Sequence, residues 1–167
     1  LGSGTMSLAL AMTMIKAQCH HVIRPNVILP GYGCPDLVSA AVYAGLQPVL
    51  VDIEENYHGF NLHCLASAIN ESTVAVIAVN FLGIPERLAD IRKLLEPLPS
   101  VYLIEDNAQW FPELHHGESL SGDYVCLSFG RGKPVSLLGG GALLIKESLE
   151  EREDFDQTLE SKNWVNS

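Results

Sequence analysis

Clusters of basic residues are missing from this sequence, which contains 10 Lys and Arg against 20 Asp and Glu and has a formal net charge of -10 at pH 7. Recognition of nucleic acids depends on Lys and Arg gathered on one surface, where they neutralise phosphates. The sequence therefore predicts no nucleic-acid partner. Part of the acidity lies in residues 147–160, which we interpret as one solvated helix face.

Long apolar runs and a secretory signal are also missing. No apolar run approaches the roughly 20 residues that a helix needs to cross a bilayer. The first residues lack the basic start of a secretory signal. We therefore expect no membrane partner.

Cysteine and histidine do not occur in metal-binding patterns. The four cysteines are widely scattered and form no CxxC pair, so neither a disulfide framework nor a zinc site is indicated, and a cytoplasmic location is expected. Four of the six histidines form the adjacent pairs His20-His21 and His115-His116. Adjacent side chains point apart on a helix or a strand, which makes them poor joint ligands, and no metal is predicted.

The composition that is present indicates one globular domain. Of the 167 residues, 47% are hydrophobic and only 18% are charged, a balance typical of a compact fold with fully buried strands. No internal repeat, low-complexity segment or linker divides the chain. Residues 1–167 are therefore predicted to form a single domain.

Stretches with strand character alternate with stretches of helical periodicity. Strands are predicted at residues 27–29, 48–51, 74–79, 101–104, 124–128 and 142–145. Helices are predicted from a cap at Ser3 or Thr5 to residue 18, at 37–44 with a cap at Asp36 and an end at Gly45, at 62–69 and at 87–95. The alternation predicts the α/β class, as a three-layer sandwich with a mostly parallel sheet.

In such a sheet the ligand lies beyond the carboxyl ends of the strands. Three segments with small or polar residues are therefore candidates for a ligand site: one opens a helix, and two follow strands. The first is Gly2-Ser3-Gly4-Thr5, small residues that open a helix. The free N–H groups of a helix start bind phosphate well. The same residues are equally compatible with a flexible loop and an ordinary Thr cap.

The second segment is Glu105-Asp106-Asn107-Ala108-Gln109, where a carboxylate follows an apolar strand. A buried carboxylate needs a cationic partner, and a protonated pyridine nitrogen is one partner that would make the carboxylate useful in catalysis. The alternative is that Asp106 caps a following helix.

The third segment is Ser128-Phe129-Gly130-Arg131-Gly132-Lys133, which follows a strand and precedes three glycines. A lysine beside glycines at a strand end can approach a ligand closely. A lysine in a loop is, however, more often a solvated surface residue.

Together these segments resemble a known family. SGT at a helix start, EDxAQ after an apolar strand and SFxxxK followed by GGGA, in this order, resemble the DegT-type sugar aminotransferases, which are fold type I pyridoxal 5'-phosphate (PLP) enzymes. VILPGYGCPDLVSAAVYAGLQPVLVDI also resembles that family, and the resemblance runs from about Gly2 to Ile145. The competing nucleotide-binding interpretation is weak because GSGT is not GxGxxG.

The resemblance implies a role for individual residues. Lys133 would form the Schiff base with PLP, and Asp106 would pair with the pyridine nitrogen. Gln109 would contact the ring hydroxyl. Gly4, Thr5 and Ser128 would bind the phosphate.

The sequence departs from the family at the position of the aromatic residue that covers the cofactor ring. Cys34 stands there, so the nearby Tyr32 is the candidate for stacking on the ring. Gly130-Arg131-Gly132 is also richer in glycine and more basic than is usual before the lysine. These departures suggest a divergent branch whose substrate need not be a nucleotide-linked keto sugar.

The resemblance also implies an architecture and an activity. The last strand should be antiparallel, the protein should be a homodimer, and residues 1–167 should be the large catalytic domain without the family's upstream segment and smaller carboxyl-terminal domain. The expected reaction moves an amino group from an amino acid to a keto-sugar-like acceptor. A dehydratase is less expected because Lys133 is present where those enzymes typically carry histidine. The other class is a non-catalytic PLP-fold scaffold or sensor.

Overall fold

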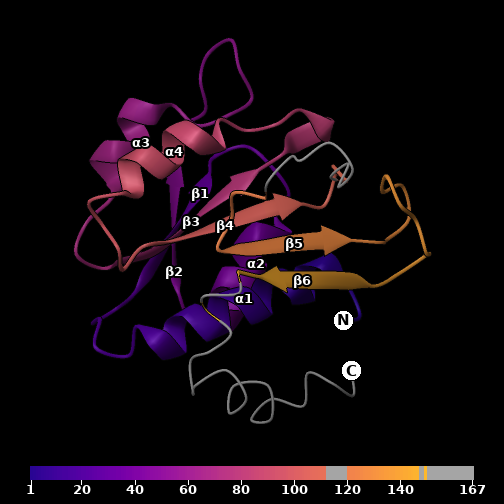
Figure 1. Ribbon diagram of the computed structural model, residues 1–167, viewed down its shortest axis with the longest axis horizontal. Helices are drawn as coiled ribbons and strands as arrows, with labels where there is room; N and C mark the ends of the chain where they lie inside the picture. Colours follow the sequence, from indigo (N-terminus) through magenta and orange to yellow (C-terminus); the bar gives the residue numbers. More distant parts are fainter. Residues whose placement is uncertain (112–119, 147–148, 150–167) are drawn as a thin grey trace.

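The computed structural model describes residues 1–111, 120–146 and 149, and these form an α/β sandwich with three layers (Figure 1). The sheet is built in the order β2-β1-β3-β4-β5-β6. The first five strands of that order are parallel, and β6 is antiparallel to β5, as predicted. The strands are β1 (Asn26–Pro30), β2 (Gln47–Val51), β3 (Thr73–Val79), β4 (Tyr102–Asn107), β5 (Tyr124–Ser128) and β6 (Gly141–Ile145).

Helices cover both faces of the sheet because the central strands are apolar on both faces (Figure 1). In β1, Val27 and Leu29 belong to the core under α1 (Gly4–Gln18) and α2 (Asp36–Ala44), whereas Ile28 belongs to the opposite core. That second core lies under α3 (Leu62–Ala68) and α4 (Leu88–Leu95). None of the helices described is both long and apolar enough to cross a membrane.

All six predicted strands and four predicted helices are present, with differences at their ends. The largest difference is in β4, which continues through Glu105, Asp106 and Asn107, all buried, where the prediction stopped at residue 104. The polar side chains concealed this extension, but pairing with β3 on one side and β5 on the other keeps the backbone in the strand.

The predicted cap of α2 was wrong. Pro35 occupies the cap position with φ -62, a helical value, and Asp36 is already the first residue of the helix. Of the two candidate caps of α1, Ser3 is the one used, since its hydroxyl accepts from the Met6 N–H. Thr5 instead donates its hydroxyl to the Asp36 carboxylate, so the two helix starts are joined. The His115-His116 pair and most of the acidic segment 147–160 lie outside the described residues.

Candidate functional site

One cavity lies at the carboxyl edge of the sheet, beside the start of α1. The three segments singled out in the sequence all contribute to its wall, together with Cys34. The predicted site residues that line it are Gly4, Thr5, Cys34, Asp106, Gln109, Ser128 and Lys133. The parallel sheet explains this convergence, because β4 and β5 are neighbours and end at the same edge.

The start of α1 packs directly against the end of β5 at Gly4. A Cβ atom on Gly4 would lie 2.6 Å from Ser128 Cβ and 2.9 Å from Ser128 Oγ, a distance that no side chain tolerates. Only glycine therefore lets the helix start and the Ser128 hydroxyl share one wall of the cavity. The first N–H groups of a helix have no partner within the helix and carry its positive dipole end. This wall is suited to an anion.

Asp106 supplies a buried carboxylate to the same cavity. Its Oδ1 accepts from the Ala108 N–H at 2.9 Å, and among the described residues no donor reaches Oδ2. Burial raises the pKa of Asp106 to about 6, although the Ala108 hydrogen bond and the positive charge of Lys133 act to lower it. Asp106 therefore retains the capacity to bind a cationic or N–H group of a ligand. No helix is capped by Asp106 in the part of the chain that the structure describes.

Lys133 is half-buried and faces Asp106 closely enough to influence its ionisation. Its backbone N–H donates to the Gly130 carbonyl at 3.3 Å, which closes the turn after β5. The side chain lines the cavity, as the catalytic interpretation requires, rather than lying in bulk solvent.

Gln109 is oriented by the 3-10 turn η1 (Phe81–Gly83) that follows β3. The Leu82 N–H donates to Gln109 Oε1 at 2.7 Å, so the side-chain nitrogen of Gln109 is left as a donor. Phe81 from the same turn lines the cavity, a contribution that the sequence reasoning missed. Its position two residues after the end of an apolar strand was the available signal.

Tyr32 does not join the residues that line the cavity. It is 65% exposed, and its ring meets the edge of the Phe81 ring at a centroid distance of 5.6 Å. Cys34 lines the cavity but brings no ring to it. The aromatic side chain that the described cavity does contain is Phe81.

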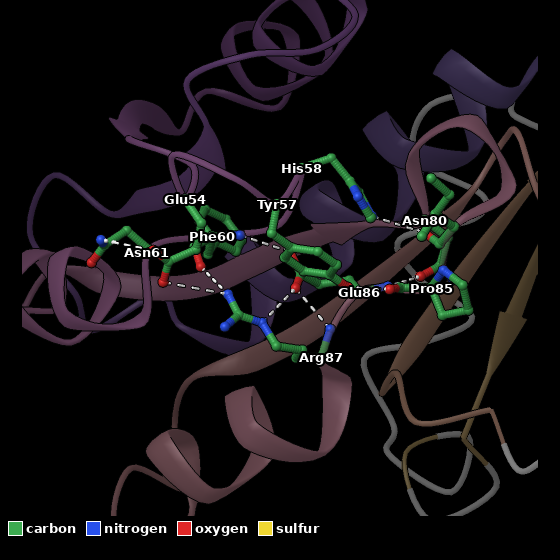
Figure 2. A network of polar contacts seen from close by, with 10 residues as sticks. Glu54, Tyr57, His58, Phe60, Asn61, Asn80, Pro85, Glu86 and Arg87 are labelled. Carbon is green, nitrogen blue, oxygen red and sulfur yellow. Dashed lines mark hydrogen bonds and ion pairs between the residues drawn. The ribbon is translucent and has the colours of Figure 1, made fainter.

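A second polar cluster holds the 80–87 segment, which carries Phe81, against its neighbours (Figure 2). The buried Glu86 carboxylate accepts from the backbone N–H groups of Phe60 and Arg87, at 2.8 and 2.7 Å. Arg87 lies over the Tyr57 ring, 4.8 Å from its centroid, and pairs with Glu54 at 3.7 Å. These contacts fasten the segment to the loop after β2.

The other end of the 80–87 segment is fastened to β4. The Asn80 side-chain amide donates to Asn107 Oδ1 and, at 3.4 Å, to Glu105 Oε1. The Glu86 N–H in turn donates to Asn80 Oδ1 at 2.8 Å. Glu105 and Asn107 flank Asp106 on the opposite face of the strand, so this network fixes the strand end from which Asp106 reaches the cavity. Within the described residues no group of three His, Cys, Asp or Glu side chains could hold a metal ion.

Comparison with known proteins points to the same family as the sequence motifs that line the cavity. Residues 1–156 match the DegT/DnrJ/EryC1/StrS aminotransferase family. The UDP-N-acetyl-3-dehydro-alpha-D-glucosamine 3-aminotransferase of Acidithiobacillus ferrooxidans is 28% identical over 152 residues, which are 89% of this chain and 39% of that protein. The chain thus spans well under half the length of this curated relative.

Solved structures share the fold. An aminotransferase from Psychrobacter cryohalolentis superposes with a TM-score of 0.77 at 23% identity, over 89% of this chain and 37% of that one. The GDP-4-keto-6-deoxy-D-mannose-3-dehydratase of E. coli, with bound hydrated PLP, gives a TM-score of 0.78 at 20% identity, over 95% of this chain and 40% of that one. Since the family match covers nearly the whole chain, the chain belongs to the DegT/DnrJ/EryC1/StrS aminotransferase family.

Proposed function

We propose that this protein is a PLP-dependent aminotransferase that moves an amino group from an amino acid to a keto-sugar-like acceptor. The observation that carries the proposal is the convergence of Lys133, Asp106 and the start of α1 on one cavity. Each of these groups matches one part of PLP: the aldehyde, the pyridine nitrogen and the phosphate.

The residues present fit the cofactor. Asp106 is buried with one oxygen unpartnered among the described residues, and a protonated ring nitrogen would complete its hydrogen bonding and compensate its charge. The helix start at Gly4 and Thr5, with the Ser128 hydroxyl against it, would hold the phosphate. Gln109 would offer its side-chain N–H to the ring hydroxyl, since its oxygen already accepts from Leu82.

The chemistry divides between the cofactor and the chain. When bound, PLP supplies an electron-withdrawing ring that makes the substrate's α-proton removable. Asp106 would keep the ring nitrogen protonated, because its own charge favours the cation. Lys133 Nζ would hold the aldehyde carbon covalently; once the substrate amino group had displaced it, Lys133 would take the proton from the substrate carbon and deliver it to the cofactor side.

Two alternatives are less favoured. The E. coli dehydratase shows that the fold also serves dehydration, but residue 133 is a lysine here, which the proposed covalent anchor and base requires. A non-catalytic scaffold or sensor would not need Lys133 beside a buried Asp106 in one cavity. The names of relatives, which include GDP-perosamine synthase of Vibrio cholerae, support a nucleotide-linked sugar as the acceptor.

The proposal extends to the state of the protein in the cell. We propose a homodimer in the cytoplasm in which residues 1–167 form the large, cofactor-binding domain. Residues 1–167 correspond to 37–44% of the length of solved aminotransferase chains, which supports the proposal that they form one domain of a larger enzyme.

The test is the visible absorption of the full-length protein with PLP, before and after borohydride. We expect a reducible chromophore, and after reduction the cofactor should be found covalently attached to the peptide that contains Lys133. Lys133→Ala should abolish both the reducible chromophore and the conversion of the cofactor by amino acids. Lys93→Ala, which removes an exposed lysine of α4, is the matched control and should keep both. A reducible chromophore that survives Lys133→Ala would contradict the assignment.

A further inference from the structure

An acidic side chain stands in the wall of the proposed phosphate site. Asp36, the first residue of α2, lines the same cavity as Thr5 and Ser128. Its Oδ2 accepts the Thr5 hydroxyl at 2.9 Å. The first turn of α1, where a phosphate is expected, therefore has a carboxylate bound to one of its donors.

The charge around the cavity is not balanced for a phosphate. Among the described residues that line it, Asp36 and Asp106 are acidic and Lys133 is the only Lys or Arg. Lys133 faces Asp106 and is reserved for the aldehyde of the cofactor in the proposed function. A phosphate would consequently depend on N–H and hydroxyl donors.

The Thr5 hydroxyl has one proton to donate. While that proton is donated to Asp36, it is not available to a phosphate oxygen. A phosphate must therefore either break the hydrogen bond between Thr5 and Asp36 or bind without the Thr5 hydroxyl as a donor. The negative charge of Asp36 remains nearby in either case.

We propose that Asp36 weakens the affinity of this site for the phosphate group of its cofactor, by engaging the Thr5 hydroxyl and by charge repulsion. The proposal rests on the proposed function, since it takes the cavity to be the cofactor site. A second observation points to a ligand here: the buried Asp106 lines the same cavity, and no donor among the described residues reaches its Oδ2. The consequence is a cofactor that the enzyme holds loosely and exchanges readily.

The experiment measures dissociation constants of the full-length protein for PLP, for pyridoxal, which lacks the phosphate, and for inorganic phosphate as a competitor. Asp36→Asn removes the charge but keeps an oxygen that can accept from Thr5. We expect it to tighten PLP and phosphate binding roughly tenfold, the effect typical of one charged interaction. Pyridoxal binding should change less than twofold, which also shows that the cavity is intact.

Two further variants separate the two causes. Asp36→Ala removes the acceptor as well as the charge, and should tighten PLP binding more than Asp36→Asn does. When Thr5→Val is combined with Asp36→Ala, the gain should shrink, because no hydroxyl is released for the phosphate. Asp90→Asn, which removes an exposed carboxylate of α4, is the matched control and should leave all three constants within twofold.

The results distinguish this inference from the proposed function. Unchanged or weaker PLP binding in Asp36→Asn would overturn the inference, and so would an equal gain for pyridoxal. If the wild-type protein binds no PLP, the proposed function fails by itself. The inorganic phosphate arm then decides the inference, which stands if Asp36→Asn raises phosphate affinity and falls if it does not.

Discussion

Burial of the Asp106 carboxylate has an energetic consequence that can be measured without any substrate. The folded-state pKa of about 6 lies above the ordinary aspartate pKa of 3.8, so the folded protein holds the proton more tightly than the unfolded chain does. The stability from this group is therefore fully present below about pH 4 and is lost as the pH rises through about 6. A shift of about two units corresponds to about 3 kcal/mol.

We predict that Asp106→Asn is more stable than wild type at pH 7.5 without cofactor, by an amount on the order of 1 to 3 kcal/mol. The asparagine remains neutral, so it has no charge to desolvate. At pH 4 the two proteins should be nearly equal in stability. Urea unfolding at both pH values, followed by circular dichroism, measures the difference.

Asp90→Asn is again the control, since it removes a carboxylate from the exposed surface of α4. If Asp106→Asn is less stable than wild type at pH 7.5, the prediction is wrong. Such a result would show that interactions in the cofactor-free protein fully offset the desolvation cost of the ionised Asp106 carboxylate. Saturation with PLP should reverse the order, because the ring nitrogen then stabilises the ionised aspartate of the wild type.

At the level of elements, the 80–87 segment is held by close packing against the loop after β2. A Cβ atom on Gly59 would lie 2.2 and 2.5 Å from the two carboxylate oxygens of Glu86 and 2.5 Å from Tyr57 Cε1. Glu86 has little freedom to move away, since it accepts from two backbone N–H groups. The loop can therefore approach the 80–87 segment this closely at Gly59 only because residue 59 has no side chain.

Gly59→Ala should accordingly lower the free energy of unfolding by about 1 to 3 kcal/mol, the usual cost of inserting a methyl group into a packed site. Gly139→Ala is the matched control, since a Cβ atom there would meet nothing within 4 Å. Chemical denaturation of both variants gives the comparison. Equal effects of the two substitutions would mean that the contact between Gly59 and Glu86 is not tight in solution.

For the whole molecule, the proposed homodimer has a candidate surface in the loop that follows Lys133. Leu137 is 68% exposed and Leu138 is 74% exposed, and Leu82 of the turn after β3 is 70% exposed. Exposed leucines beside a ligand cavity are typical of a surface that a partner covers.

We predict that Leu137→Glu combined with Leu138→Glu converts the full-length protein from dimer to monomer while its circular dichroism spectrum is kept. Burying two new carboxylates without partners would cost more than the association provides. Light scattering after gel filtration measures the mass. Ile23→Glu, at a residue that is 82% exposed in the segment before β1, is the control and should remain dimeric. A wild-type protein that is monomeric at every concentration would contradict the proposed assembly.

The sequence by itself determined the class of fold, because apolar runs and helical periodicity are local properties. The fully buried stretch of β3 could only suit a strand covered on both faces, and Gly45 ended α2 as its type predicts. Motif order also indicated Lys133, Asp106 and the start of α1 as parts of one site, and the structure brings them to one cavity.

Tertiary structure alone decided which contacts those residues make. The polar end of β4 became strand because both neighbours pair with it, and Thr5 turned from a possible cap to a partner of Asp36 because two helix starts meet. Tyr32 stayed outside the cavity and Phe81 entered it, since Gln109 holds the turn after β3, and Glu105 and Asn107 of β4 hold Asn80 at its start. Periodicity and capping preferences act over a few residues, whereas these contacts join positions roughly 20 to 30 residues apart in sequence, and only the packed sheet brings such positions together.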